Sequence, residues 1–143
     1  MNYKEIKPLV IEWASEKNLT DSGKQYIKVF EEVGELAGAI LKNDLPEIKD
    51  AIGDICVTLI IHGVQTNTCY DIKVSDIIYQ DMTPSSLFAH LVDEINNTSN
   101  YAISQLNEIA HKYNTTLDEC LLLAWNVIKN RTGKTVNGTF IKD

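Results

Sequence analysis

The chain has 143 residues, of which 44% are hydrophobic and 23% charged, a composition that suits one globular domain and excludes intrinsic disorder. Its 13 basic and 20 acidic residues give a net charge of −7, which argues against broad electrostatic capture of nucleic acid or of an anionic membrane surface. Seven Gly and three Pro leave long uninterrupted stretches, so we expect an all-α fold.

The chain carries no sign of export or of membrane insertion. Residues 1–17 mix charges into apolar residues and lack the continuous hydrophobic region of a signal peptide. The longest uncharged run, residues 55–70, is too short and too polar to span a bilayer. Cys56, Cys69 and Cys120 have no C-x-x-C spacing, which favours reduced thiols. We therefore expect a cytoplasmic protein.

Helical spacing of apolar residues dominates the first half of the chain. It predicts a first helix over residues 3–17, a second that begins after Asp21 and ends near Lys42, and a third from Pro46 to about Gln65. Because the connection between the second and third helices is short, we expect them to form an antiparallel hairpin.

The second half is harder to interpret. Residues 66–83 have no sustained period, and we expect a loop with one turn of helix around residues 75–79. A further helix starts at Thr83 and could run to Tyr113, or be broken in two by the polar residues 96–100.

The C-terminal part has clearer signals. Thr116 and Glu119 fit a capping box that leads into a helix ending at Arg131. Asn137-Gly138 between β-branched residues predicts a small β-hairpin. We find no repeat, low-complexity tract or linker, and we expect a single domain over residues 1–143.

Acidic residues gather on the second and third helices. Glu31, Glu32 and Glu35 crowd one turn, a repulsive arrangement that Lys28 can offset in part. Asp50 and Asp54 share one stripe of the third helix, where no Lys or Arg follows Asp54. A solvated acidic face remains the simple alternative. If the two helices form a hairpin, however, the two carboxylate groups can meet at one site.

A site built from carboxylates alone suits hard cations. Glu32, Glu35, Asp50 and Asp54 are therefore candidate ligands of Mg²⁺, with Mn²⁺ as the alternative ion. Glu108 and His111 form one E-x-x-H motif, but a di-iron bundle needs a second such motif on another helix, which the sequence lacks.

The C-terminal end reverses the charge balance. From Cys120 to Lys142 the chain has Lys129, Arg131 and Lys134 but no acidic residue. These cations could complement a helix dipole or grip a phosphate opposite a metal.

The motifs E-E-V-G-E at residues 31–35 and D-A-I-G-D at residues 50–54 resemble the signature of the MazG-like all-α nucleoside triphosphate pyrophosphohydrolases. The sequence from Ala124 to Lys142 is similar to the ending of the short, often phage-encoded members. Residues 67–115 do not align and are a possible insertion.

The resemblance implies metal-dependent hydrolysis of a (deoxy)nucleoside triphosphate to monophosphate and pyrophosphate. Glu32, Glu35 and Asp54 match metal ligands of the family, whereas Ala51 stands where the family has Glu. We expect Asp50 to replace that ligand. The residues expected to act in catalysis are Glu31 and Glu35, and those expected to bind substrate are Trp13, Lys28, Asn126, Lys129, Arg131 and Lys134.

The alternative function is a non-catalytic helical interaction module with a solvated or cation-filled acidic cluster, for which Ala51 would be evidence.

The hairpin is expected to expose apolar residues, Val57, Ile60, Ile61 and Val64 among them. Together with the family resemblance, this predicts a homodimer or homotetramer.

Overall fold

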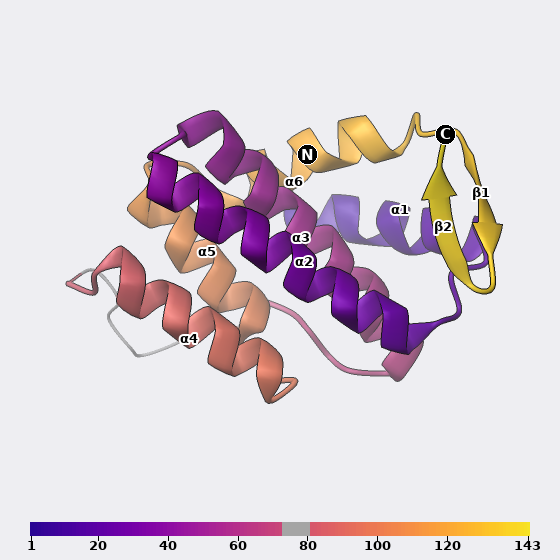
Figure 1. The fold of residues 1–143 in the computed structure, drawn as a ribbon, viewed down its shortest axis with the longest axis horizontal. Helices are drawn as coiled ribbons and strands as arrows, with labels where there is room; N and C mark the ends of the chain where they lie inside the picture. Colours follow the sequence, from indigo (N-terminus) through magenta and orange to yellow (C-terminus); the bar gives the residue numbers. More distant parts are fainter. Residues whose placement is uncertain (73–80) are drawn as a thin grey trace.

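The computed structural model describes residues 1–72 and 81–143, which form a helical bundle with a small β-hairpin at the C-terminal end (Figure 1). The helices and strands are α1 (Tyr3–Glu16), α2 (Ser22–Lys42), α3 (Leu45–Thr66), α4 (Pro84–Asn96), α5 (Ala102–Lys112), α6 (Leu117–Ile128), β1 (Gly133–Val136) and β2 (Thr139–Lys142). The all-α architecture with a C-terminal hairpin is confirmed. The helical turn predicted around residues 75–79 lies outside the described residues.

Helices α2 and α3 form the predicted antiparallel hairpin in the middle of the molecule (Figure 1). The Asp21 carboxylate accepts from the Lys24 amide at the start of α2, and Asp44 accepts in the same way from Glu47 at the start of α3. Between them, Asn43 ends α2 in the left-handed conformation, with φ 52°. These caps fix where both helices begin and therefore which carboxylates face each other.

Helix α3 is the most buried element, and this corrects one expectation from the sequence. Val57, Ile60 and Ile61 are buried, at 6%, 2% and 4% exposure, and only Val64 is exposed, at 53%. The first three are covered because α1, α2, α5 and α6 pack against α3. They therefore do not form an uncovered face of the monomer.

The sequence left open whether the helix that starts at Thr83 runs unbroken to Tyr113. The polar run between Asn96 and Tyr101 separates α4 from α5, so the long helix is broken in two. Helix α6 is capped by the Thr116 hydroxyl, which accepts from the Glu119 amide at 3.1 Å. It ends at Ile128 rather than Arg131, so Arg131 lies on the link to the hairpin.

The β-hairpin is held against the connection between α1 and α2. Its turn uses Asn137 and Gly138, both with positive φ. The Gly138 carbonyl accepts from the amides of Thr20 (3.1 Å) and Asp21 (3.3 Å), and the Thr135 hydroxyl donates to the Lys17 carbonyl. The strands pair antiparallel, with Val136 opposite Thr139. Within residues 1–72 and 81–143, no helix is both long enough and apolar enough to cross a membrane.

Candidate active site

A cleft of about 520 Å³ lies between α2, α3, the end of α6 and the β-hairpin. The predicted site residues in its lining are Trp13, Lys28, Glu31, Glu32, Glu35, Asp54 and Arg131. Elements that are far apart in the sequence thus place carboxylates, cations and aromatic rings in one hollow. The arrangement suits a ligand that has both charged and aromatic parts.

Three carboxylates meet on one turn of α2. Glu31, Glu32 and Glu35 can each offer an oxygen, and these oxygens lie within 4.8 Å of one another. The spacing follows from helix geometry, since residues three and four apart share a face. Among the described residues, this is the group of acidic, His or Cys side chains that is close enough to hold a metal ion.

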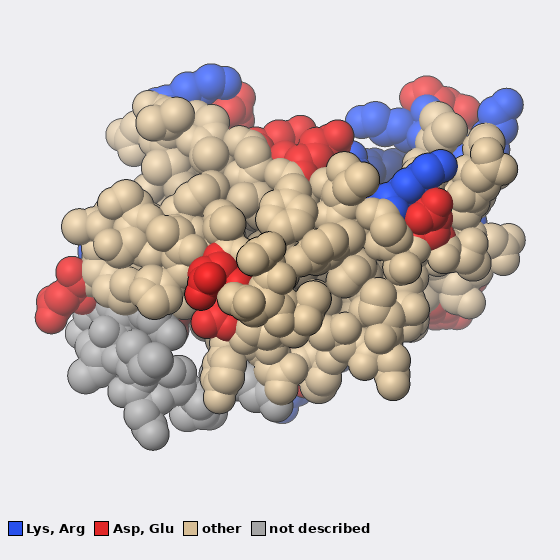
Figure 2. Space-filling view, turned by 60° about the horizontal axis from the view of Figure 1, so that its bottom comes forward, with Lys and Arg blue, Asp and Glu red and all other residues tan. Residues whose placement is uncertain are grey.

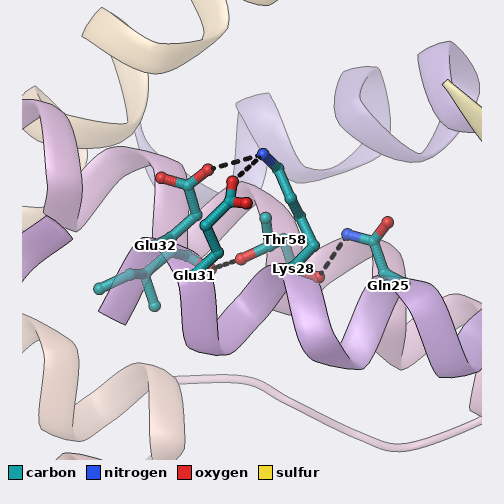
Figure 3. A network of polar contacts seen from close by, with 6 residues as sticks. Gln25, Lys28, Glu31, Glu32 and Thr58 are labelled. Atoms are coloured by element: carbon teal, nitrogen blue, oxygen red, sulfur yellow. Dashed lines mark hydrogen bonds and ion pairs between the residues drawn. The ribbon is translucent and has the colours of Figure 1, made fainter. Parts of the chain in front are cut away.

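Lys28 bridges two of these carboxylates. Its Nζ contacts Glu31 and lies 3.3 Å from Glu32 Oε1, as Figure 3 shows. Burial lowers the pKa of Lys28, but the hydrogen bonds and charges of Glu31 and Glu32 outweigh that effect and raise it overall. The cation therefore stays charged beside the cluster and offsets part of its repulsion.

Glu32 is the buried member of the cluster, with 7% exposure. Burial, followed by the charge of Asp54, raises its pKa from 4.5 to about 7, although Lys28 opposes the rise. Its Oε2 atom is buried and has no hydrogen-bond partner among the described residues. A buried carboxylate oxygen without a partner is costly, and a cation or a proton would relieve that cost.

Asp54 approaches from α3. Burial raises its pKa from 3.8 to about 6, Arg131 opposes the rise, and Asp50 and Glu35 add to it. Arg131, from outside α3, is thus the cation whose charge acts most strongly on Asp54. Asp54 is therefore the carboxylate at which the acidic cluster and the basic tail meet.

The donor set fits a hard divalent cation. It consists of carboxylate oxygens from two helices, without His or thiol, which is the ligand chemistry that Mg²⁺ and Mn²⁺ prefer. The unpartnered Glu32 Oε2 supplies an acceptor position that the protein itself does not satisfy. Glu31, Glu32 and Glu35 are the carboxylates close enough to one another to hold such an ion, and Asp54 lines the same cleft from α3.

Asp50 lies next to the cleft rather than in it. It lines a neighbouring hollow of about 430 Å³ together with Ala51, and Glu35 and Asp54 line both hollows. Asp50 is exposed, whereas Ala51 is 3% exposed. A carboxylate at position 51 would start from a buried backbone position, while Asp50 reaches the same pair of carboxylates from the surface.

The predicted substrate-binding residues of the basic C-terminal segment do not all lie in the cleft. Arg131 lines the cleft, whereas Asn126, Lys129 and Lys134 are exposed and do not. Because α6 ends at Ile128, the backbone turns before Arg131 and brings it toward Asp54. The substrate-binding roles of the other three residues stay predictions.

The cleft also holds residues that the sequence analysis did not select. They are Leu19, Lys24, Gln25, Ile27, Val57, Thr58, Ile61, Ile128, Thr139, Phe140 and Lys142. The Gln25 amide donates to the Thr58 carbonyl at 3.3 Å and ties α2 to α3 (Figure 3). The turn signal at Asn137-Gly138 predicted the hairpin, but no local pattern indicates that its second strand faces the carboxylates.

Comparison with known proteins agrees with this geometry. Residues 22–83, which include all of α2 and α3, match the model of the MazG nucleotide pyrophosphohydrolase domain. An uncharacterised 18.2 kDa protein from the rep-hol intergenic region of Haemophilus phage HP1 is 41% identical over 59 residues. That alignment covers 39% of this chain and 36% of the phage protein, about a third of the relative's length. No solved structure matches the chain. The similarity to the MazG nucleotide pyrophosphohydrolase domain family therefore rests on residues 22–83, the part of the chain that forms the α2–α3 hairpin.

Proposed function

We propose that the protein hydrolyses a nucleoside or deoxynucleoside triphosphate to the monophosphate and pyrophosphate, and that it requires Mg²⁺ or Mn²⁺. The observation that carries the proposal is the buried, unpartnered Glu32 oxygen within a cluster of carboxylates that faces Arg131 across one cleft. A triphosphate needs both parts of this arrangement, since its charge is neutralised by cations and by a metal that carboxylates hold.

The carboxylates have two roles, ion binding and proton acceptance, and Glu35 is a candidate for both. Glu32, Glu35, Asp54 and, from the adjoining hollow, Asp50 would hold the ion. The bound ion supplies charge neutralisation at the phosphates and lowers the pKa of water. Glu31 or Glu35 accepts the proton of the attacking water, since both are exposed members of the cluster.

The cations position the phosphate chain. Arg131 offers a planar fork of donors beside Asp54, and Lys28 a point charge beside Glu32. Both favour the charge that develops on the leaving pyrophosphate. Lys24 and Lys142 add two further cations to the cleft wall.

Product analysis tests the proposal directly. The full chain is incubated with each canonical ribo- and deoxynucleoside triphosphate, with Mg²⁺ and with chelator, and the phosphate products are separated. We expect monophosphate and pyrophosphate in equal amounts from at least one nucleotide, and none with chelator. Orthophosphate as the first product contradicts the proposal, and inactivity with every nucleotide favours the non-catalytic interaction module.

The variant Glu32→Gln tests whether Glu32 itself binds the metal ion or whether activity depends only on the acidic cluster as a whole. The amide keeps the size of the side chain but binds a hard cation less well, so we expect activity to fall at least tenfold and to recover in part at high Mg²⁺. Glu12→Gln, at an exposed position of α1 that does not line the cleft, is the control and should leave turnover unchanged. Equal activity of the two variants would remove Glu32 from the metal site.

The compartment and the partners are part of the same proposal. Cys56, Cys69 and Cys120 are free thiols, which supports the reducing environment of the cytoplasm. Nucleoside triphosphates are the proposed small-molecule partners, and a second copy of the chain is the proposed protein partner.

A further inference from the structure

The cleft changes character along its length. The carboxylates Glu32, Glu35 and Asp54 line the cleft from α2 and α3. From Asp54 to Ile61 the helix rises about 10 Å. Ile61 lines the same cleft, together with Leu19, Trp13 and the β2 residues Thr139, Phe140 and Lys142. A ligand held at the carboxylates can therefore extend toward a wall that carries aromatic and apolar side chains.

The aromatic ring that this wall presents is Phe140. It is half-buried, while Trp13 is only 8% exposed and belongs to the core. The two rings meet edge to face with centroids 5.3 Å apart, and Lys17 Nζ lies 5.6 Å from the Phe140 centroid. Trp13 thus supports Phe140 from behind, and Phe140 has the larger surface available to a ligand.

Next to this ring is a hydroxyl without a partner. Thr139 lines the cleft, and its Oγ1 is covered but makes no hydrogen bond with the described residues. Rotation about χ1 moves a threonine hydroxyl among the staggered positions, so a ligand can draw it toward the cleft. A polar ligand group would then restore a hydrogen bond that the free protein lacks.

The strand that carries both residues is fixed in place. The Gly138 carbonyl, directly before Thr139, accepts from Thr20 and Asp21 at 3.1 and 3.3 Å. A Cβ at Gly138 would lie 2.6 Å from Thr20 Oγ1, so the turn packs closely against the start of α2. The wall is therefore held at a set position relative to the carboxylates on α2.

We propose that the C-terminal β-hairpin determines nucleoside specificity: Phe140 contacts the nucleoside part of the substrate, and the Thr139 hydroxyl bonds to a polar group of it. The inference rests on the proposed function, which places the triphosphate at the carboxylates. It assigns the recognition of the remaining part of the substrate to β2 rather than to Trp13.

Thr139→Val and Phe140→Leu test the inference, because Val replaces only the hydroxyl and Leu keeps an apolar side chain without a ring. Thr139→Ser restores the hydroxyl, and Ile141→Val, an exposed position of the same strand that does not line the cleft, is the matched control. Binding of each nucleoside monophosphate and of pyrophosphate is measured by calorimetry with Mg²⁺ present. Turnover of the nucleotide panel is measured on the same proteins.

We expect Thr139→Val and Phe140→Leu to weaken binding of the preferred monophosphate by roughly three- to tenfold, which is the range of one neutral hydrogen bond or ring contact. Pyrophosphate binding should change by less than about twofold, and Thr139→Ser should recover the loss. The ratios of kcat/KM between nucleotides should shift in the same variants, and comparison of ribo- with deoxynucleotides assigns the contact to sugar or base.

Equal weakening of monophosphate and pyrophosphate, or unchanged nucleotide ratios, overturns the inference while leaving the proposed function intact. A wild-type protein that releases pyrophosphate from no nucleotide overturns the proposed function instead. Thermal unfolding of every variant identifies a loss of fold, and the Thr139 pair remains decisive if Phe140→Leu is unstable.

Discussion

Glu32 combines burial with like-charged neighbours, and both shift its titration. Its pKa rises from 4.5 to about 7 because burial disfavours the charged form and Asp54 repels it. In the folded protein Glu32 therefore holds its proton over a pH range in which the unfolded chain has lost it. The contribution of Glu32 to the free energy of unfolding is present below pH 4.5 and is lost as the pH rises to about 7.

The first prediction follows from this loss of stability with rising pH. Without metal, we expect the wild-type protein to lose stability between about pH 4.5 and 7 relative to Glu32→Gln, which has no proton to release. Added Mg²⁺ at pH 8 should stabilise the wild type more than the variant, because the ionised carboxylate binds the cation. Thermal unfolding across pH measures both effects. Parallel curves for the two proteins would show that Glu32 titrates normally.

Asp50 and Ala51 decide whether the second motif is a working variant. Asp50 borders Glu35 and Asp54 from the surface, and its neighbour Ala51 is buried. We expect Asp50→Asn to weaken Mg²⁺ binding nearly as much as Asp54→Asn does, because each removes one carboxylate from the same set. Restoring the family residue with Ala51→Glu should add like-charge crowding and little affinity.

Mg²⁺ titration by calorimetry and the Mg²⁺ dependence of turnover measure these variants. A silent Asp50→Asn together with tighter binding by Ala51→Glu would mean that the site is one ligand short. Far-ultraviolet circular dichroism provides the control, because helical content should be the same in all three variants.

At the scale of elements, local signals fixed most of the helices. The caps at Asp21 and Asp44 and the stop at Asn43 are short-range features, so the α2–α3 hairpin and its shared carboxylate face followed from spacing alone. The predicted end of α6 was wrong by about one turn. Lys129 to Arg131 continue the composition of a helix, whereas in the structure the helix ends at Ile128. The position of β2 near the start of α2 was missed, since it depends on hydrogen bonds that the Gly138 carbonyl accepts from residues more than 100 positions away.

The contact between α3 and α6 gives a prediction at this scale. A Cβ at Gly53 would overlap the Cys120 carbonyl and lie 2.9 Å from the Ala124 Cβ, so the helices approach as closely as glycine allows. We expect Gly53→Ala to destabilise the protein by about 1–3 kcal/mol, in spite of the better helix propensity of alanine. Gly38→Ala, on α2 with open space around it, should instead stabilise by about 0.5–1 kcal/mol. Denaturant unfolding compares the two, and equal effects would contradict the close approach.

At the scale of the molecule, one apolar core draws residues from all six described helices. It includes Leu91 of α4 and Ile103 of α5, which lie in the stretch that resembled no known pattern. This supports the proposal that residues 1–143 form a single domain. The sequence predicted the apolar faces of these helices but not how they pack, because the partners of a helix face are set by tertiary contacts rather than by its own period.

Self-association is the remaining prediction, and its surface differs from the one that the sequence suggested. Because Val57, Ile60 and Ile61 are buried, the exposed apolar side chains lie elsewhere, and one group follows a stripe of α2 with Ile27 72% and Leu41 87% exposed. Other exposed areas are also poor in charge, as the middle of the face in Figure 2 shows. Along the α2 stripe Gly34 has open space around it, so a second copy could approach the helix backbone closely.

We expect the purified protein to have the mass of a dimer or tetramer in light scattering at micromolar concentration, and Gly34→Lys to reduce it toward the monomer. The lysine places a charge in the middle of the stripe, while the open space at Gly34 and the better helix propensity of lysine leave the monomer fold intact. Lys42→Ala, which removes a charge at the end of α2, is the control and should keep the wild-type mass. A monomeric wild type would contradict self-association, and an unchanged mass for Gly34→Lys would move the interface away from this stripe of α2.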